Sequence, residues 1–146
     1  MDKEQSVIVD GTNMLAGRLS SNVAKLLLKG NRVTIVNCEK IMISGSRKNI
    51  IGNYKQFLSV ASILHPEHGP YHPRKPDTIM TRMVRGMLPK KKPSGQAALK
   101  RLRTYIGVPS EFRSKEKITL ENAKITRSVA NYTSMSELVT EVGKAL

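Results

Sequence analysis

The most constraining feature of the sequence is a strand–helix–strand pattern in its first third. Residues 6–9 form a short, continuous apolar run. Such runs are typical of strands that are buried on both faces of a parallel sheet. Apolar residues then repeat at helical spacing from Leu15 until Gly30, a residue that suits the end of a helix, and Thr12 or Asn13 is the expected N-cap. Residues 32–37 form a second strand candidate, which a right-handed crossover would make parallel to the first. The pattern predicts an α/β fold with one face of the helix packed on the sheet.

The remaining sequence predicts short elements around an extended segment. Four of its prolines fall in residues 65–76, where they disfavour a helix or central strand and predict a stiff, extended arm. At 146 residues the chain has about the length of one domain, so we expect a single domain over 1–146 with a basic arm and short helices at 65–106. The other predicted elements are a strand at 40–44, helices at 46–64, 77–85 and 94–106, a strand formed from 117–120 with 123–126, and a last helix at 134–146 that opens with a Ser134–Glu137 capping box.

The charge balance is the strongest global signal in the sequence. Lys and Arg number 25 against 11 Asp and Glu, which gives a net charge of +14 and a pI near 10.2. Residues 65–103 hold ten of these cations but only two acids, together with all three histidines. Such an excess works against compactness unless a polyanion neutralises it, so the sequence predicts a polyanionic partner.

Composition also bears on the compartment. No apolar run approaches the roughly 18 residues that a membrane span needs, so we expect a soluble protein. The first five residues have neither the basic region nor the apolar core of a secretory signal, which predicts a cytoplasmic location. The single cysteine, Cys38, cannot form an intramolecular disulfide and lies in an apolar-rich run, where we expect a buried and inert thiol.

Enzymatic and metal-binding functions have little support in the motifs. Gly11 and Gly17 are separated by five residues, and Arg18-Leu19 stands where a P-loop has Lys followed by Ser or Thr. The three histidines at 65–72 have no nearby thiol and are surrounded by prolines, so we expect no metal site. The acidic residues are scattered and suggest no catalytic pair, although sequence alone leaves a triad assembled in space open. We therefore expect no enzyme and no cofactor, and an enzyme on a nucleotide-binding core is the weakest hypothesis.

The basic segment favours structured RNA as the polyanion. A charge run is often only a solvated face, but here the cations accompany stiffening prolines and two short amphipathic helices. These helices are too short and interrupted for a membrane-surface helix. Aromatic residues make up only 4% of the chain, so base stacking is scarce and recognition should rest on phosphates and groove shape. DNA remains the competitor, although no zinc-finger or basic-zipper motif is present.

Four blocks of sequence are familiar together. DGTNMLAGRLSSNVA (10–24), VNCEKIMISG (36–45), GPYHPRKP (69–76) and VRGMLP (84–89) occur in this order. They resemble the family of large-subunit ribosomal protein thirteen, most strongly between residues 6 and 107, and the arm and total length resemble its archaeal branch. The resemblance implies a three-layer α/β/α fold with a mainly parallel four-stranded sheet, and a role in assembling and stabilising the large subunit through ribosomal RNA. It also implies RNA contacts for Arg74, Arg82, Arg85 and Lys90, although residues 90–93 are more basic and proline-rich than is usual for the family.

The leading hypothesis is a non-enzymatic scaffold of the cytoplasmic ribosome. Its partners would be large-subunit ribosomal RNA and neighbouring ribosomal proteins, with no membrane, metal or small-molecule substrate. The second hypothesis is a free RNA- or DNA-binding regulator that uses the same arm. The candidate RNA-binding residues are Arg18, Arg47, Lys48, Tyr71, His72, Arg74, Lys75, Arg82, Arg85, Lys90, Lys91, Lys92, Lys100, Arg101 and Arg103.

Overall fold

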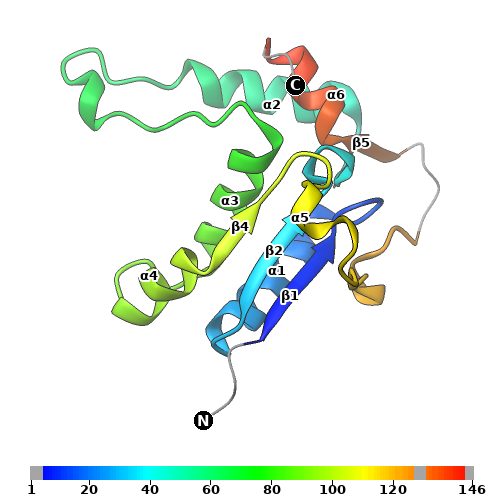
Figure 1. Cartoon of the computed structure of the whole chain (residues 1–146). Helices are drawn as coiled ribbons and strands as arrows, with labels where there is room; N and C mark the ends of the chain where they lie inside the picture. Colours follow the sequence, from blue (N-terminus) through cyan, green and yellow to red (C-terminus); the bar gives the residue numbers. More distant parts are fainter. Residues whose placement is uncertain (1–4, 127–130, 144–146) are drawn as a thin grey trace.

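The largest sheet of the protein is parallel and has three strands. The computed structural model describes residues 5–126 and 131–143. Within these residues, β2 (Arg32–Val36) lies between β1 (Ser6–Asp10) and β4 (Leu102–Thr104) (Figure 1). Val33 pairs with Val7 on one side and with Leu102 on the other, and both pairings are parallel. The predicted α/β class and the parallel pairing of the first two strands are confirmed.

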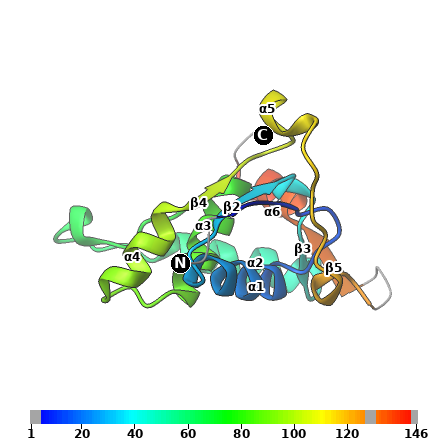
Figure 2. The same ribbon diagram turned by 60° about the horizontal axis from the view of Figure 1, so that its bottom comes forward.

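Two helices cover one face of this sheet. The helices α1 (Ala16–Leu28) and α3 (Pro76–Met87) lie together on that face, whereas the other side carries the four-residue helix α5 (Ser110–Arg113) (Figure 2). The core between helices and sheet contains fully buried aliphatic side chains from both, because the helical and the strand periodicities each direct one face inward. These residues include Val9, Leu19, Val23, Leu27, Val33, Ile35, Met80 and Val84.

The start of α1 differs from the prediction. Neither Thr12 nor Asn13 caps the helix: the N-cap is Leu15, which makes no side-chain cap, and Asn13 has a φ of 56°. The backbone just before the helix pairs instead with distant segments, since Leu15 donates its N–H to the carbonyl of Ala123 (2.8 Å) and Met14 accepts from the N–H of Met42 (2.8 Å). Because these long-range hydrogen bonds hold the preceding backbone, the N-cap lies at Leu15 and not at residue 12 or 13.

A second, smaller sheet stands beside the first. It pairs β3 (Met42–Ser44) with β5 (Tyr132–Ser134) in antiparallel fashion, and it is flanked by α2 (Arg47–Ser59) and α6 (Met135–Glu141). The predicted strand at 40–44 starts at Met42, because residues 38–40 form a 3₁₀ turn, η1 (Cys38–Lys40). The predicted helix at 46–64 ends at Ser59.

The capping box that was expected at the last helix is partly confirmed. The Ser134 hydroxyl accepts a hydrogen bond from the N–H of Glu137 (3.2 Å), which satisfies one of the free donors at the helix start. The helix α6 that follows ends at Glu141, and the end of the predicted element, residues 144–146, lies outside the described residues.

The strand predicted from 117–120 with 123–126 is reduced to isolated bridges. Ile118 forms one parallel bridge with Val9: its N–H donates to the carbonyl of Ile8 (2.8 Å), and its own carbonyl accepts from Asp10 (3.2 Å). Residues 121–123 then form a 3₁₀ turn, η3 (Glu121–Ala123). The implied four-stranded sheet and three-layer arrangement are therefore not confirmed in the described residues.

The prediction of a helix over 94–106 is wrong in its second half. The helix α4 (Pro93–Lys100) stops at Lys100, and Leu102–Thr104 form β4. Leu99, Leu102 and Ile106 have helical spacing, but Leu102 is buried as a strand residue and Ile106 is 40% exposed. Pairing with β2 outweighs the local helical preference, because it satisfies the backbone and buries Leu102 together.

The turn after β1 is structural. A Cβ at Gly11 would lie 2.8 Å from Cγ1 of Ile41, so the glycine allows Ile41 to pack closely against the turn. Cys38 is fully buried nearby, and burial raises the pKa of its thiol to about 12. The predicted burial of Cys38 is confirmed.

Asp10 closes this turn and should make folding pH-dependent. Its Oδ1 accepts from the Thr12 N–H (3.0 Å), the Thr12 hydroxyl (2.7 Å) and Nδ2 of Asn37 (2.9 Å). Burial raises the pKa of Asp10, but these bonds and the charge of Lys40 outweigh it, so the pKa is lowered overall. The stabilisation is therefore complete above the unfolded value of about 4 and is lost as the pH falls from there through the lowered folded pKa.

Replacing Asp10 by Ala is expected to reduce the free energy of unfolding by about 1–2 kcal/mol at pH 6, because the hydrogen bonds of Thr12 and Asn37 are lost. Urea unfolding of both proteins between pH 3 and pH 6 measures the effect. The difference between them should shrink towards pH 3. A difference that stays constant over this range would contradict the role assigned to the carboxylate.

Candidate nucleic-acid interface

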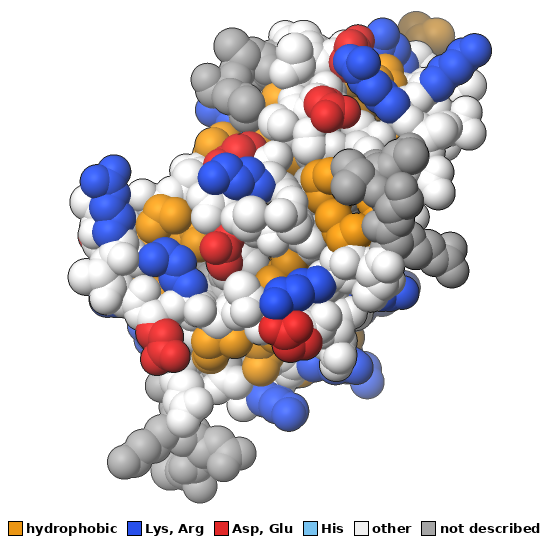
Figure 3. All heavy atoms as spheres, turned by 90° about the vertical axis from the view of Figure 1, so that its right-hand side faces the viewer, with side chains coloured by type: hydrophobic (Ala, Val, Ile, Leu, Met, Phe, Trp, Pro, Cys, Tyr) orange, Lys and Arg blue, Asp and Glu red, His pale blue; other side chains and the backbone are white. Residues whose placement is uncertain are grey.

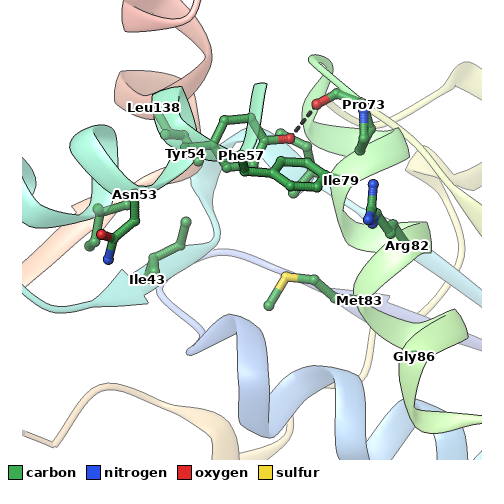
Figure 4. A pocket seen from close by; sticks show the side chains of 11 residues that line it. Ile43, Asn53, Tyr54, Phe57, Pro73, Ile79, Arg82, Met83, Gly86 and Leu138 are labelled. Atoms are coloured by element: carbon green, nitrogen blue, oxygen red, sulfur yellow. Dashed lines mark hydrogen bonds between the residues drawn. The ribbon is translucent and has the colours of Figure 1, made fainter. Parts of the chain in front are cut away.

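The arm is held to the body of the protein at its base. We define the arm as residues 60–75, which leave the end of α2, project outward and return to α3 (Figure 1). His72 Nε2 lies 2.7 Å from the carbonyl of Val60. This contact joins the segment that leaves α2 to the segment that returns to α3. The Tyr54 hydroxyl of α2 donates to the carbonyl of Pro73, as Figure 4 shows. The conformation of the arm is therefore set by contacts with its own chain.

Arg82 on α3 is part of this attachment. Its guanidinium lies 4.5 Å from the centre of the Phe57 ring and donates to the carbonyl of Tyr71. Tyr54 and Phe57 of α2 line a hollow of about 470 Å³ together with Arg82 and Met83 of α3 (Figure 4). Through these two contacts, Arg82 positions the arm against α2 and α3.

Arg74, Tyr54 and His72 also support the base of the arm. Arg74 donates through Nη1 to the carbonyl of Val142 (3.2 Å), the residue that follows α6. Burial raises the pKa of Tyr54 despite the opposing charges of Arg82 and Arg74. The ring of His72 packs edge-on against Phe57, with centroids 4.7 Å apart, and its exposure is only partial.

Replacing Arg82 by Ala is expected to loosen the arm by about 1 kcal/mol, because a cation–π contact and a charged hydrogen bond are lost at a partly exposed site. Hydrogen–deuterium exchange over residues 60–75 measures the change as faster exchange. Arg85→Ala is the matched control on the same helix. If the two variants exchanged alike, the positioning role of Arg82 would be wrong.

The first cluster of cations surrounds the turn between α3 and α4. We call Arg85, Lys90, Lys91 and Lys92 the turn cluster. All four are exposed, and Arg85 and Lys90 share the lining of a hollow of about 260 Å³ with Leu88. Within residues 5–126 and 131–143, none of their side chains forms an ion pair or hydrogen bond. Four unpaired cations on one short segment form a surface suited to phosphates.

The second cluster lies on the face of the sheet that α1 and α3 leave uncovered. We call Arg32, Lys100, Arg101 and Arg103 the sheet cluster, which lines a hollow of about 370 Å³ with Ser6, Thr34 and Phe112. Arg101 is tied down, since its Nη2 donates to the carbonyl of Leu27 (2.8 Å). Arg103 is exposed and donates to the carbonyl of Leu102 (3.0 Å).

The other predicted residues lie apart from these clusters. Arg47 contacts Glu141 (2.6 Å) and is thus partly neutralised, while its neighbour Lys48 lines a shallow groove with Lys55. Arg18 is exposed beside Gly17 on α1. Tyr71 and Lys75 are exposed on the arm. The candidate RNA-binding residues are thus distributed among the arm and its base, the turn cluster, the sheet cluster and separate positions on α1 and α2.

The surface outside these clusters has a different character. The face that carries β1 and residues 110–126 shows Lys and Arg interspersed with Asp and Glu (Figure 3). On this side Lys124 pairs with Glu121 at 2.6 Å. The excess charge is therefore not spread evenly over the surface.

Sequence reasoning missed Arg32 and Lys55. Arg32 pairs in register with Ser6 of β1. Thr34, two residues further along the same strand β2, pairs with Arg103 of β4. The alternation of side chains along strands would have placed Arg32 and Arg103 on one face, had β4 been recognised. Lys55 lies two helical turns after Lys48, a spacing that α2 alone could have revealed.

Other kinds of site find little support in the structure. Over the described residues there is no group of three or more His, Cys, Asp or Glu side chains that could hold a metal ion. The same residues include no helix that is long and apolar enough to cross a membrane.

Comparison with known proteins gives a consistent result. A family model described as ribosomal protein L13 matches residues 4–111. The large ribosomal subunit protein uL13 of Methanococcoides burtonii is 39% identical over 137 residues, which cover 93% of this chain and 96% of the relative. That of Methanosphaera stadtmanae is 45% identical over 126 residues (84% and 89%), and that of Aeropyrum pernix is 40% identical over 140 residues (95% and 90%).

Proposed function

The chain belongs to the ribosomal protein L13 family, and on this premise we propose that it is a structural constituent of the large ribosomal subunit that binds and stabilises ribosomal RNA. This is a family of ribosomal proteins and not of enzymes. The proposed location is the ribosome in the cytoplasm, and the proposed partners are large-subunit RNA and adjacent ribosomal proteins.

The observation that carries the RNA-binding proposal is the grouping of exposed cations around α4. The three lysines of the turn cluster directly precede this helix, and three cations of the sheet cluster lie at or just after its end, while Arg85 belongs to α3 and Arg32 to β2. Lysines act as point charges towards phosphates, whereas exposed arginines such as Arg85 and Arg103 can grip a phosphate with two N–H groups. Because the RNA releases counterions when it meets these groups, the binding should weaken steeply with salt.

The fold details implied by the resemblance are part of the same proposal. The bridge between Ile118 and Val9 supports a fourth strand position next to β1. The segment that follows β4 and includes Phe112 would supply the third layer, on the side of the sheet opposite α1 and α3 and next to the sheet cluster.

Sedimentation of a cell extract tests the proposed function. The chain is expected to migrate with large subunits, and to move to the light fractions when the extract is treated with ribonuclease. Migration in the light fractions of an untreated extract would contradict the proposal. It would favour a free RNA- or DNA-binding regulator that uses the same basic residues.

A further inference from the structure

The outer part of the arm exposes large apolar side chains. We define the arm tip as residues 62–70. Ile63 is 95% exposed and Leu64 is 86% exposed, which are extreme values for aliphatic residues. Tyr71, at the base of the tip, is 71% exposed. Adjacent exposed apolar residues that the fold does not cover commonly mark an interaction site.

The arm tip also contains no Lys or Arg, and its titratable side chains are His65, Glu67 and His68. No Lys or Arg occurs between Lys55 and Arg74, although the whole chain carries 25 of them. The one formally charged residue of the tip is Glu67. The cations of the arm are confined to its base, at Arg74 and Lys75, so the tip lacks the groups that neutralise phosphates.

The tip is shaped by its own hydrogen bonds. Residues 66–68 form a 3₁₀ turn, η2 (Pro66–His68), in which the N–H of Gly69 donates to the carbonyl of Pro66 (3.2 Å). The Ser62 hydroxyl accepts from the N–H of His65 (3.2 Å). A turn built in this way presents Ile63 and Leu64 in a defined conformation, so little chain entropy would be lost when they are buried.

RNA is a poor match for this surface. Aliphatic side chains cannot stack on bases as aromatic rings do, and RNA surfaces are dominated by phosphates that favour cations. An apolar socket on a protein matches both the side chains and the lack of charge, because burial of Ile63 and Leu64 needs no counterion. From this complementarity we propose that Ile63 and Leu64 insert into an apolar socket on a neighbouring protein of the large subunit. This rests on the proposed function, since the neighbour belongs to the same particle.

Site-directed cross-linking tests the contact. Ile63→Cys can be labelled with benzophenone maleimide, because the natural cysteine, Cys38, is buried. The labelled chain is assembled into large subunits that lack the native copy and is irradiated. A chain labelled through Leu28→Cys, an apolar residue of α1 that is 50% exposed, is the matched control. The expected result is an adduct between position 63 and one ribosomal protein that the control does not form.

Three other results would overturn the proposal: an adduct with RNA, an adduct with a second copy of this chain, or no specific adduct. Sedimentation before irradiation separates this failure from that of the proposed function. A wild-type chain that does not enter the particle overturns both, whereas one that enters without the protein adduct overturns only the docking of the tip.

A double variant gives an independent measurement. Ile63→Ser with Leu64→Ser is expected to weaken retention of the chain in salt-washed subunits by about 10- to 100-fold, because two apolar side chains lose their burial. Its affinity for an isolated RNA fragment should stay within about twofold of wild type, since the tip makes no phosphate contacts. Leu28→Ser should change neither quantity. An equal loss in both assays would assign the tip to RNA instead.

Discussion

Replacing Arg85, Lys90, Lys91 and Lys92 together by Ala is expected to weaken binding to a large-subunit RNA fragment by about 100- to 1000-fold at physiological salt. Each residue of the turn cluster is exposed and unpaired over the described residues, so each can neutralise a phosphate. The slope of log affinity against log salt should fall in magnitude by about 3, because fewer counterions are released. A titration at several salt concentrations measures both quantities.

The matched control removes the same charge from another place. Arg113, Lys115, Lys117 and Lys124 lie in residues 110–126, a segment that also carries Glu111, Glu116 and Glu121. Their replacement by Ala should reduce the affinity far less, because those cations are not grouped around α4. If the two variants lost the same affinity, net charge alone would explain binding and the turn cluster would not be a site.

Replacing Gly95 by Ala is expected to lower the free energy of unfolding by about 2–3 kcal/mol, although alanine favours a helix. Gly95 is buried in the first turn of α4 and packs against Pro89, the residue that ends VRGMLP. An added Cβ would overlap the carbonyl oxygen of Pro89 and lie 2.7 Å from its carbonyl carbon. Because these are backbone atoms, the turn that carries Lys90, Lys91 and Lys92 would have to move.

Gly86→Ala is the control for this prediction. Gly86 lies within α3, and a Cβ there would meet no atom within 4 Å. The Gly86→Ala substitution should stabilise the protein by about 0.5–1 kcal/mol, because it removes the conformational freedom of a helical glycine in the unfolded chain. Urea unfolding of both variants is the measurement. A Gly95→Ala protein as stable as wild type would show that the turn yields easily.

Local patterns predicted the first elements well, for physical reasons that act over short distances. Residues 6–36 form a strand, a helix and a parallel strand, because apolar periodicity in each segment specifies which face is buried. The buried thiol of Cys38 and the Ser134 cap were predicted in the same way. The blocks that carry the family resemblance also lie in order along the chain, and the comparisons confirm the family.

Several failures are places where a distant segment competes with a local preference. Leu102 fits a helix by spacing but forms β4, because β2 offers it backbone partners and a buried position. Asn13 has the chemistry of a helix cap, yet long-range bonds to residues 42 and 123 hold the adjacent backbone in another conformation. Residues 117–120 look like a strand and make one bridge.

The amino-acid sequence by itself determined that this chain is an α/β protein with a large positive charge, most of it between residues 65 and 103, because composition and periodicity are properties of neighbouring residues. Only the tertiary structure decided how that charge is used. In the folded protein, Arg82 and Arg74 hold the arm through hydrogen bonds to backbone carbonyls, and Arg32 and Arg103 line the same hollow. The apolar side chains of the arm tip remain exposed. Charges act through space, and distances through space are set by the packing of elements that lie far apart in the chain.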